Sequence, residues 1–397
     1  MGNTILFAVL PPLARSVGLH DFQVLSIFMV SALFWVTFSP IWGRLSDQHG
    51  RRRFILMGYA AFAASTTLFA LALDAGRRGA LAGLALYGSL IAARAAWGLI
   101  GSASAAVGQA YIADRTPPSR RASGLAAFTA AFGLGAMLGP AFAGAVASVA
   151  PQWGPVAPVY AVAGAALCAV VAIAVFLKER TAPTTRPRAP AMSPLDPRVR
   201  GLLILGFAVS VATGAQTQFT TFFYIDRIAP PGASETALLE GAGVALSASA
   251  GAALFAQLAL VRGFNLRPAL LMRAGPIALA LGHVVIAFST SLGAFAFGAL
   301  LGGLGAGLAA PGFVGGASLA VTDDEQGAVS GLANAATASS FVVGPPVAYA
   351  LYALAPQFLF AATAGVAAGA AAYAIIGGPV GALRRAHPPQ SANEAPD

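Results

Sequence analysis

Charged side chains that could bind ligands or protons gather in one short segment between two long apolar runs. This arginine segment, residues 43–54, holds four arginines, Asp47 and the glycines Gly43 and Gly50. The four histidines of the chain are scattered, Cys168 is the single cysteine, and no HExxH pattern or nucleotide-binding loop occurs. Catalysis and metal binding need clustered groups. We therefore expect no enzyme, no metal and no cofactor.

The composition indicates the solvent that surrounds the chain. Of 397 residues, 57% are hydrophobic and only 9% are charged, whereas a soluble domain carries about 25% charged residues. Such a chain cannot cover a water-facing surface, so we expect an integral membrane protein in a lipid bilayer. The net charge of +9 does not indicate a nucleic acid partner, because the arginines lie in short loops between apolar runs.

The elements that position these charges are apolar runs long enough to cross a bilayer. A span needs roughly 20 residues, and the first run, residues 2–14, is shorter, so we expect a first helix that lacks its beginning. We predict twelve helices, at residues 2–14, 22–43, 54–73, 83–113, 122–148, 157–177, 201–224, 237–261, 269–289, 292–320, 327–352 and 357–379.

The polar segment 178–200 divides these helices into two groups of six. It is rich in proline and basic residues, too polar to pack and too short for a domain. We predict a six-helix bundle at 1–177, a cytoplasmic linker at 178–200, a second bundle at 201–380 and a disordered tail at 381–397. The short sequences Ser-Gly-Leu-Ala and Gly-Pro occur in the same order in the fifth and eleventh helices, at residues 123–140 and 330–345. This predicts an all-α membrane protein of two pseudo-repeats.

The basic residues predict the orientation of the chain. With twelve spans, seventeen of the 23 lysines and arginines fall on the side of the arginine segment, the linker and both termini. Loops rich in lysine and arginine stay in the cytoplasm. We therefore expect both termini in the cytoplasm and a multi-pass protein of the bacterial inner membrane.

The arginine segment resembles the loop between helices 2 and 3 in the major facilitator superfamily, Gly-x-Leu-(Ala/Ser)-Asp-x-x-Gly-Arg-(Arg/Lys). The residues that match are Gly43, Leu45, Ser46, Asp47, Gly50, Arg51 and Arg52. The resemblance implies a cytoplasmic gate in which Asp47, Arg51 and Asp114 lie together, with Gly43, Gly50 and Arg52 shaping the turn. Asp323 and Asp324, at the start of the eleventh helix, would pair with arginines of this loop when the cytoplasmic side closes. Topology alone, or helix capping by Thr322 and Glu325, remains an alternative.

Two further patterns are similar to signatures of the family. Residues 90–98 resemble its helix 4 signature, with Trp97 where glutamine is common, and this implies a role for Arg94 on the proton or substrate path. The glycines and proline of the fifth helix are similar to the motif of the drug:proton antiporters, which seals the interface between halves; they are Gly135, Gly139, Pro140 and Gly144. A structural role for Arg94, and chance spacing of small residues, are the alternatives.

Polar, aromatic and titratable side chains predict the substrate and proton sites. Polar and aromatic residues that could line a central cavity are Gln216, Gln218, Phe222 and Asn334. Proton coupling needs a titratable group, yet Asn3 occupies the helix 1 position that many family antiporters use. Glu240 and Asp226 are our candidates, and His283 is a further one that is more often structural.

The resemblance implies a secondary transporter that works by alternating access as a monomer. We expect proton-coupled efflux of small amphipathic molecules, with the substrate, protons and the bilayer as partners and no nucleic acid. A sugar or metabolite carrier of the same superfamily, working as exporter or uptake carrier, is the alternative, and a non-transporting membrane sensor is a more distant one.

Overall fold

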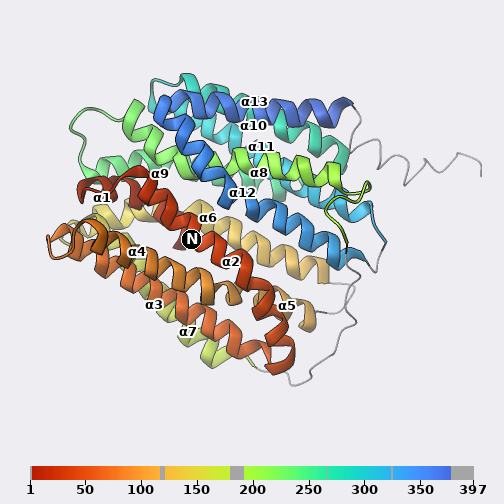
Figure 1. Cartoon of the computed structure of the whole chain (residues 1–397), viewed down its shortest axis with the longest axis horizontal. Helices are drawn as coiled ribbons and strands as arrows, with labels where there is room; N and C mark the ends of the chain where they lie inside the picture. Colours follow the sequence, from red (N-terminus) through yellow and green to blue (C-terminus); the bar gives the residue numbers. More distant parts are fainter. Residues whose placement is uncertain (1, 117–120, 179–191, 265, 323–324, 377–397) are drawn as a thin grey trace, which may run out of the picture.

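The computed structural model describes residues 2–116, 121–178, 192–264, 266–322 and 325–376, and every element in this part of the chain is helical (Figure 1). The elements are α1 (Gly2–Ser16), α2 (Asp21–His49), α3 (Arg51–Arg77), α4 (Gly83–Ala96), η1 (Trp97–Gly101), α5 (Ser102–Arg115), α6 (Arg121–Val149), η3 (Pro151–Val156), α7 (Ala157–Phe176), α8 (Arg200–Phe223), η4 (Tyr224–Ile228), α9 (Glu235–Phe255), η5 (Ala256–Val261), α10 (Pro268–Phe288), α11 (Leu292–Leu319), α12 (Gln326–Leu354) and α13 (Pro356–Ile376).

These elements confirm the twelve-helix membrane fold, because α4, η1 and α5 together form the predicted fourth helix. Ten helices of the described part are long and apolar enough to cross a bilayer. The other two predicted helices, α1 and α6, contribute the shorter apolar stretches Thr4–Ser16 and Gly133–Val149. Residues 179–191 and 377–397 lie outside the described part, so the linker, the tail and the exact domain boundaries stay predictions.

The arginine segment is helical on both sides of one glycine. α2 runs six residues past the predicted end at residue 43 and stops at His49. Gly50 has φ +94°, a conformation that favours glycine, and α3 begins at the next residue. Gly43 lies inside α2, where an added Cβ would meet nothing within 4 Å. The backbone conformation at the turn therefore favours glycine at position 50, whereas Gly43 lies within the helix before the turn.

The predicted fourth helix is interrupted by a π-helical turn, η1. Within it, an added Cβ on Gly98 would lie 2.4 Å from the Ser31 carbonyl oxygen, and one on Gly101 would lie 2.5 Å from Trp97 Cδ1. Both glycines therefore allow contacts that any side chain would block. Turns of this kind occur often at functional sites, and this one follows Arg94 directly.

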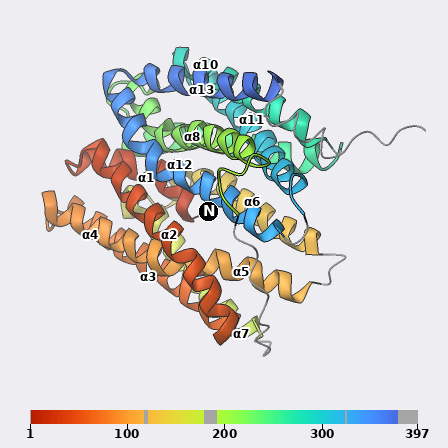
Figure 2. The same ribbon diagram turned by 45° about the vertical axis from the view of Figure 1, so that its right-hand side comes forward.

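The described helices form two sets, α1–α7 and α8–α13, and ion pairs that join the two sets lie at one end of the molecule. We call this the Arg15 end and the opposite one the Arg51 end. The largest buried apolar cluster mixes residues of both sets, such as Leu10, Phe69, Phe223 and Tyr352, and lies toward the Arg15 end. The clusters near the Arg51 end draw their buried residues from one set each. In Figure 2 the Arg51 ends of α2 and α3 lie at the bottom, far from α10 and α13 at the top.

The predicted internal repeat matches the helices of the two sets. α6 and α12 each contain 29 residues. α6 contains one proline and α12 contains two. Each helix is followed after one residue by a proline, Pro151 or Pro356, that begins the next element. Proline fits the first turn of a helix because the missing N–H has no helical partner there. The two helices are thus equivalent in length and in the way they end.

Candidate functional site

An ion cluster at the Arg15 end joins the two sets of helices. Arg15, in the last turn of α1, lies between two carboxylates: its Nη2 is 2.6 Å from Asp21 Oδ2 and its Nη1 is 2.5 Å from Asp226 Oδ1. The hydroxyl of Tyr352 donates to Asp226 Oδ2 at 2.7 Å. Asp21 begins α2, whereas Asp226 and Tyr352 belong to the second set. One guanidinium therefore connects both sets, with two charge-assisted contacts to Asp226.

Further contacts between the sets surround this cluster. Arg77 Nη2, at the end of α3, lies 3.6 Å from Glu235 Oε2 at the start of α9. The hydroxyl of Thr221 donates to the Phe7 carbonyl oxygen at 2.7 Å, and this contact is buried. The rings of Phe22 and Tyr349 pack with centroids 5.3 Å apart. Polar, ionic and aromatic contacts therefore all close the Arg15 end.

At the Arg51 end, the described contacts of the first charge cluster join helices of the first set. Arg51 forms an ion pair with Asp47 of α2, and its Nε lies 3.1 Å from Asp114 Oδ2 at the end of α5. Its Nη1 also donates to Ser46 Oγ at 2.6 Å. The structure thus brings together Asp47, Arg51 and Asp114, as the resemblance implies. This cluster fixes α2, α3 and α5 to one another, and Arg52 adds a bond to the Ala174 carbonyl of α7.

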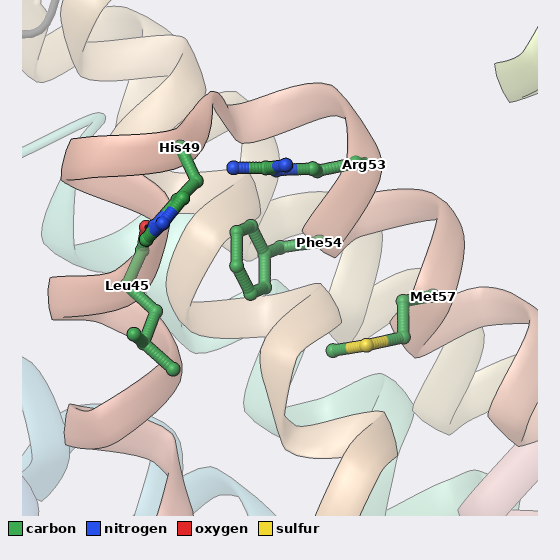
Figure 3. Close-up of a pocket in the computed structure, with 5 residues that line it drawn as sticks. All are labelled: Leu45, His49, Arg53, Phe54 and Met57. Atoms are coloured by element: carbon green, nitrogen blue, oxygen red, sulfur yellow. The ribbon is translucent and has the colours of Figure 1, made fainter.

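A shallow hollow of about 270 Å³ lies beside this cluster, lined by Leu45, His49, Arg53, Phe54 and Met57. Figure 3 shows Arg53 extended above the ring of Phe54 toward His49. The Arg53 guanidinium carbon is 5.4 Å from the Phe54 ring centroid. The hollow is open to the surface and belongs to the turn between α2 and α3.

The second charge cluster at the Arg51 end joins the segment directly before α8 to the residue directly before α12. Arg198 Nη2 is 2.8 Å from both Asp196 Oδ2 and Glu325 Oε1. Hydrogen bonds from Arg198 and Thr322 lower the pKa of Glu325 to about 2. Glu325 therefore binds an arginine that lies two residues before α8. Asp323 and Asp324 lie outside the described residues, so their pairing with the arginine segment stays a prediction.

The antiporter-like motif of α6 packs against α9 of the other set. An added Cβ on Gly144 would lie 3.5 Å from Glu240 Cγ, and one on Gly243 would lie 3.1 Å from the Pro140 carbonyl oxygen. Gly139 and Pro140 are buried, and the Gly135 carbonyl oxygen accepts a bond from Thr4 Oγ1 at 3.4 Å. Small residues allow such close helix contact. The motif therefore forms a seam between the sets, and exposed Glu240 lies on it.

Arg94 is the largest fully buried side chain of the described part, 1% exposed. Its guanidinium carbon lies 4.2 Å from the Trp97 ring centroid, and the ring of Trp35 lies 4.8 Å from that of Trp97. A desolvated cation–π contact of this kind is worth about 2 kcal/mol. The tryptophan that replaces the usual glutamine thus packs directly on Arg94.

The sequence did not indicate the buried network around His283. The His283 ring is fully buried, with Nε2 3.0 Å from Gln216 Oε1 and Nδ1 2.8 Å from Thr363 Oγ1. Gln216 Nε2 donates to Ser249 Oγ at 2.8 Å and to the Ala299 carbonyl oxygen at 3.0 Å. The network joins five helices of the second set. The side chain of Gln216 is therefore held within the packed helices. The positions of Ser249 and Thr363 in the sequence do not indicate that these residues join this network.

The other predicted cavity residues lie in different surroundings. Phe222 lies beside the Arg15 cluster, where the guanidinium carbon of Arg15 is 5.5 Å from the centroid of the Phe222 ring. Gln218 is buried in a cavity between helices of the second set, and Asn334 is exposed on α12. A central substrate cavity formed by these residues stays a prediction.

Comparison with known proteins decides the family. The sequence profile of the Major Facilitator Superfamily matches residues 1–282. This chain belongs to the Major Facilitator Superfamily. Membership identifies a membrane transporter of small molecules rather than an enzyme, and confirms the resemblance of the arginine segment.

Curated relatives of this superfamily protein are efflux-type transporters. It is 30% identical over 155 residues to Multidrug resistance protein 3 of Bacillus subtilis (38% of this chain, 27% of the relative), and 32% identical over 158 residues to the class D tetracycline resistance protein of Salmonella ordonez (38% and 36%). These alignments span only about a quarter to a third of the relatives. The class C tetracycline resistance protein of Escherichia coli is 27% identical over 370 residues, 89% of this chain and 86% of the relative.

Solved structures support the same fold. The human organic anion transporter MFSD10 superposes with a TM-score of 0.65 at 18% identity, covering 94% of this chain and 95% of that one. A bacterial homologue of the human lysosomal transporter Spinster, in an inward-facing and unoccupied conformation, superposes with a TM-score of 0.70 at 14% identity, covering 97% and 95%.

Proposed function

We propose that this transporter exports small amphipathic molecules from the bacterial cytoplasm in exchange for protons, working as a monomer in the inner membrane. The observation that carries the proposal is the closed Arg15 end. Ion pairs, a buried hydrogen bond and ring packing connect the two sets of helices there. A carrier that alternates between two states has one closed end in each of them.

The charge distribution supports an orientation with the Arg51 end in the cytoplasm. Arginines are concentrated in the arginine segment, which lies at that end, and in the sequence of the predicted linker. Positively charged loops remain in the cytoplasm during insertion. In this orientation the Arg15 cluster closes the outer side, and we assign an inward-facing state with both termini in the cytoplasm.

The surroundings of the two candidate carboxylates support different roles for them. Asp226 is engaged by Arg15 and Tyr352, so we assign it to closing the outer end. Glu240 lies on the seam between α6 and α9, where movement of one set against the other changes its exposure. A proton carrier must face each side in turn. We therefore assign proton coupling to Glu240.

The direction of transport is proposed from the relatives and the seam. Several relatives are named for resistance to tetracycline or to multiple drugs. The motif of α6 is similar to that of drug:proton antiporters, and its contact with α9 lies between the sets. We assign to Arg94, buried near the middle of its span, the role of shaping the substrate path through Trp97.

The test is transport into proteoliposomes driven by a pH gradient, with tetracycline, ethidium and glucose as probes. We expect the gradient to drive tetracycline or ethidium but not glucose, and a proton ionophore to abolish this transport. Glu240→Gln is expected to lose gradient-driven transport more than tenfold while keeping substrate exchange at equal pH. Asp74→Asn, which removes a pair within one helix, is the matched control.

Two results would contradict these assignments. Gradient-driven transport that Glu240→Gln retains in full would exclude Glu240 as the coupling group, and the same result for Asp226→Asn would remove both candidates. Transport by the wild-type protein that does not respond to the gradient would exclude proton coupling altogether.

A further inference from the structure

A lateral cavity of about 230 Å³ lies within the second set, between α8, α12 and α13. Its lining is apolar apart from three polar side chains, Gln218, Ser340 and Thr363. Pockets for drug-sized ligands measure about 300–1,000 Å³. The cavity is therefore suited to a single ring or a short chain rather than to a large drug.

The mouth of the lateral cavity faces the bilayer. Val343 and Val347 of α12 and Val366 of α13 line it and are 55%, 60% and 40% exposed. α13 lies on the side of the second set away from α1–α7 (Figure 1), so a groove between α12 and α13 opens at the perimeter. Pro345 also lines the cavity, where two prolines interrupt the hydrogen bonding of α12. A molecule dissolved in the bilayer can therefore enter from the side.

Gln218 contributes an unsatisfied hydrogen-bond acceptor to this apolar cavity. Its side chain is only 3% exposed. Its Nε2 donates to the Gly214 carbonyl oxygen at 3.3 Å, which directs Oε1 away from that turn. Oε1 is buried and has no hydrogen-bond partner among the described residues. Burial without a partner is unfavourable for an amide oxygen, so a ligand that donates a hydrogen bond there is selected.

The other polar groups of the lining are already engaged. The Ser340 hydroxyl donates to the Thr337 carbonyl oxygen at 2.6 Å. Thr363 Oγ1 lies 2.8 Å from His283 Nδ1 and 2.9 Å from the Leu359 carbonyl oxygen. Among the side chains of the lining, Gln218 Oε1 is thus the acceptor that has no partner in the described part of the chain.

We propose that the lateral cavity binds a small alcohol or phenol from the bilayer, with its apolar body between α12 and α13 and its hydroxyl donating to Gln218 Oε1. The site lies within one set of helices and does not depend on proton coupling or on the direction of transport. An ether of the same shape lacks the donor and binds more weakly.

The test is photolabelling of the full-length protein in lipid nanodiscs, with the labelled peptides mapped by mass spectrometry. The probe is 4-[3-(trifluoromethyl)diazirin-3-yl]benzyl alcohol, and its methyl ether is the matched probe without a donor. We expect the alcohol to label the lining of α8, α12 and α13 about fivefold more than the ether does, as for one hydrogen bond. Unlabelled benzyl alcohol should compete, and benzyl methyl ether should not.

Two variants locate the effect in the lateral cavity. Gln218→Leu keeps the volume and removes the acceptor, so it should reduce labelling by the alcohol to the level of the ether. Ala362→Phe fills the cavity and should reduce labelling by both probes. Gln257→Leu, a glutamine outside the lining, is the control and should change neither.

Labelling that is equal for the alcohol and the ether in the wild-type protein would overturn the proposal, and so would alcohol labelling that survives Gln218→Leu. Labels spread evenly over lipid-facing helices would show partition into the bilayer only. The comparison of the two probes needs no variant, so the proposal remains testable if a substituted protein does not fold. The readout is occupancy, so failure of this site and failure of proton-coupled export are distinguishable.

Discussion

The two ends of this transporter use the same residue types for different purposes. At the Arg15 end, one arginine contacts Asp21 of its own set and Asp226 of the other. At the Arg51 end, Arg51 contacts Asp47 and Asp114 of its own set, and Arg198 does the same with Asp196 and Glu325 in the second set. Pairs within a set hold a bundle rigid, whereas pairs between sets can hold one end closed. The role of a charge cluster therefore depends on which helices it connects.

The largest effect on transport is expected from removing Arg15. Arg15→Gln leaves Asp21 and Asp226 facing each other without the arginine between them, which destabilises the closed Arg15 end. Coupling between states is typically worth about 1–3 kcal/mol, or 5–150-fold, so we expect transport to fall more than tenfold. The measurement is substrate transport in proteoliposomes. Arg78→Gln, which loses only a pair with Asp74 of the same helix, is the control and should transport normally.

A second substitution addresses the seam that connects the sets. Gly243→Val places side-chain atoms against the Pro140 carbonyl oxygen, where even a Cβ would be only 3.1 Å away. Overpacking costs about 1–3 kcal/mol, so we expect a lower thermal unfolding midpoint and slower transport. At Gly164 of α7 an added Cβ would meet nothing within 4 Å, and Gly164→Val should have little effect. Equal effects of both substitutions would contradict a packed seam.

The smallest effect is expected from a pair within one set. The pKa of Glu325 is lowered to about 2 by Arg198 and Thr322. Because the folded pKa lies below the unfolded one, the stabilisation is fully present above about pH 4.5 and is lost as the pH falls toward 2. Glu325→Gln should therefore slightly lower the unfolding midpoint at pH 7, and the difference should shrink below about pH 4. A large loss of transport at pH 7 would instead indicate a gating role.

Much of the fold was predictable because apolar runs and their loops are separated clearly in this sequence. The twelve helices, the membrane class and the family follow from hydropathy and the arginine segment. Helix ends were less certain: the polar residues 44–49 continue α2, because helix formation does not require apolar side chains. The π-helical turn at Trp97 was missed as well, since no composition signal marks it.

The site was predictable only where a motif named the partners. The contact of Arg51 with Asp47 and Asp114 follows from the family pattern. The contacts of Arg15 and Tyr352 with Asp226 were not predicted, because Asp226 lies more than one hundred residues from either of them in the sequence. The periodicity of a sequence indicates only which residues lie on the same face of one helix. Gln216 and Gln218 looked equivalent in sequence, yet two residues along a helix point in nearly opposite directions.

The central claim is that Arg15 and Asp226 hold one end closed while the other end is open. Spin labels on α2 and α12 test it at both ends, with the pair His20 and Leu354 at the Arg15 end and the pair Gln48 and Ser330 at the Arg51 end. All four positions are exposed, and the exposed Cys168 is replaced by serine beforehand. Double electron–electron resonance then gives the distance distribution of each pair.

We predict a short distance for His20 and Leu354 and a long one for Gln48 and Ser330, with Arg15→Gln lengthening the first and shortening the second. Distances at both ends that do not change in Arg15→Gln would contradict the account.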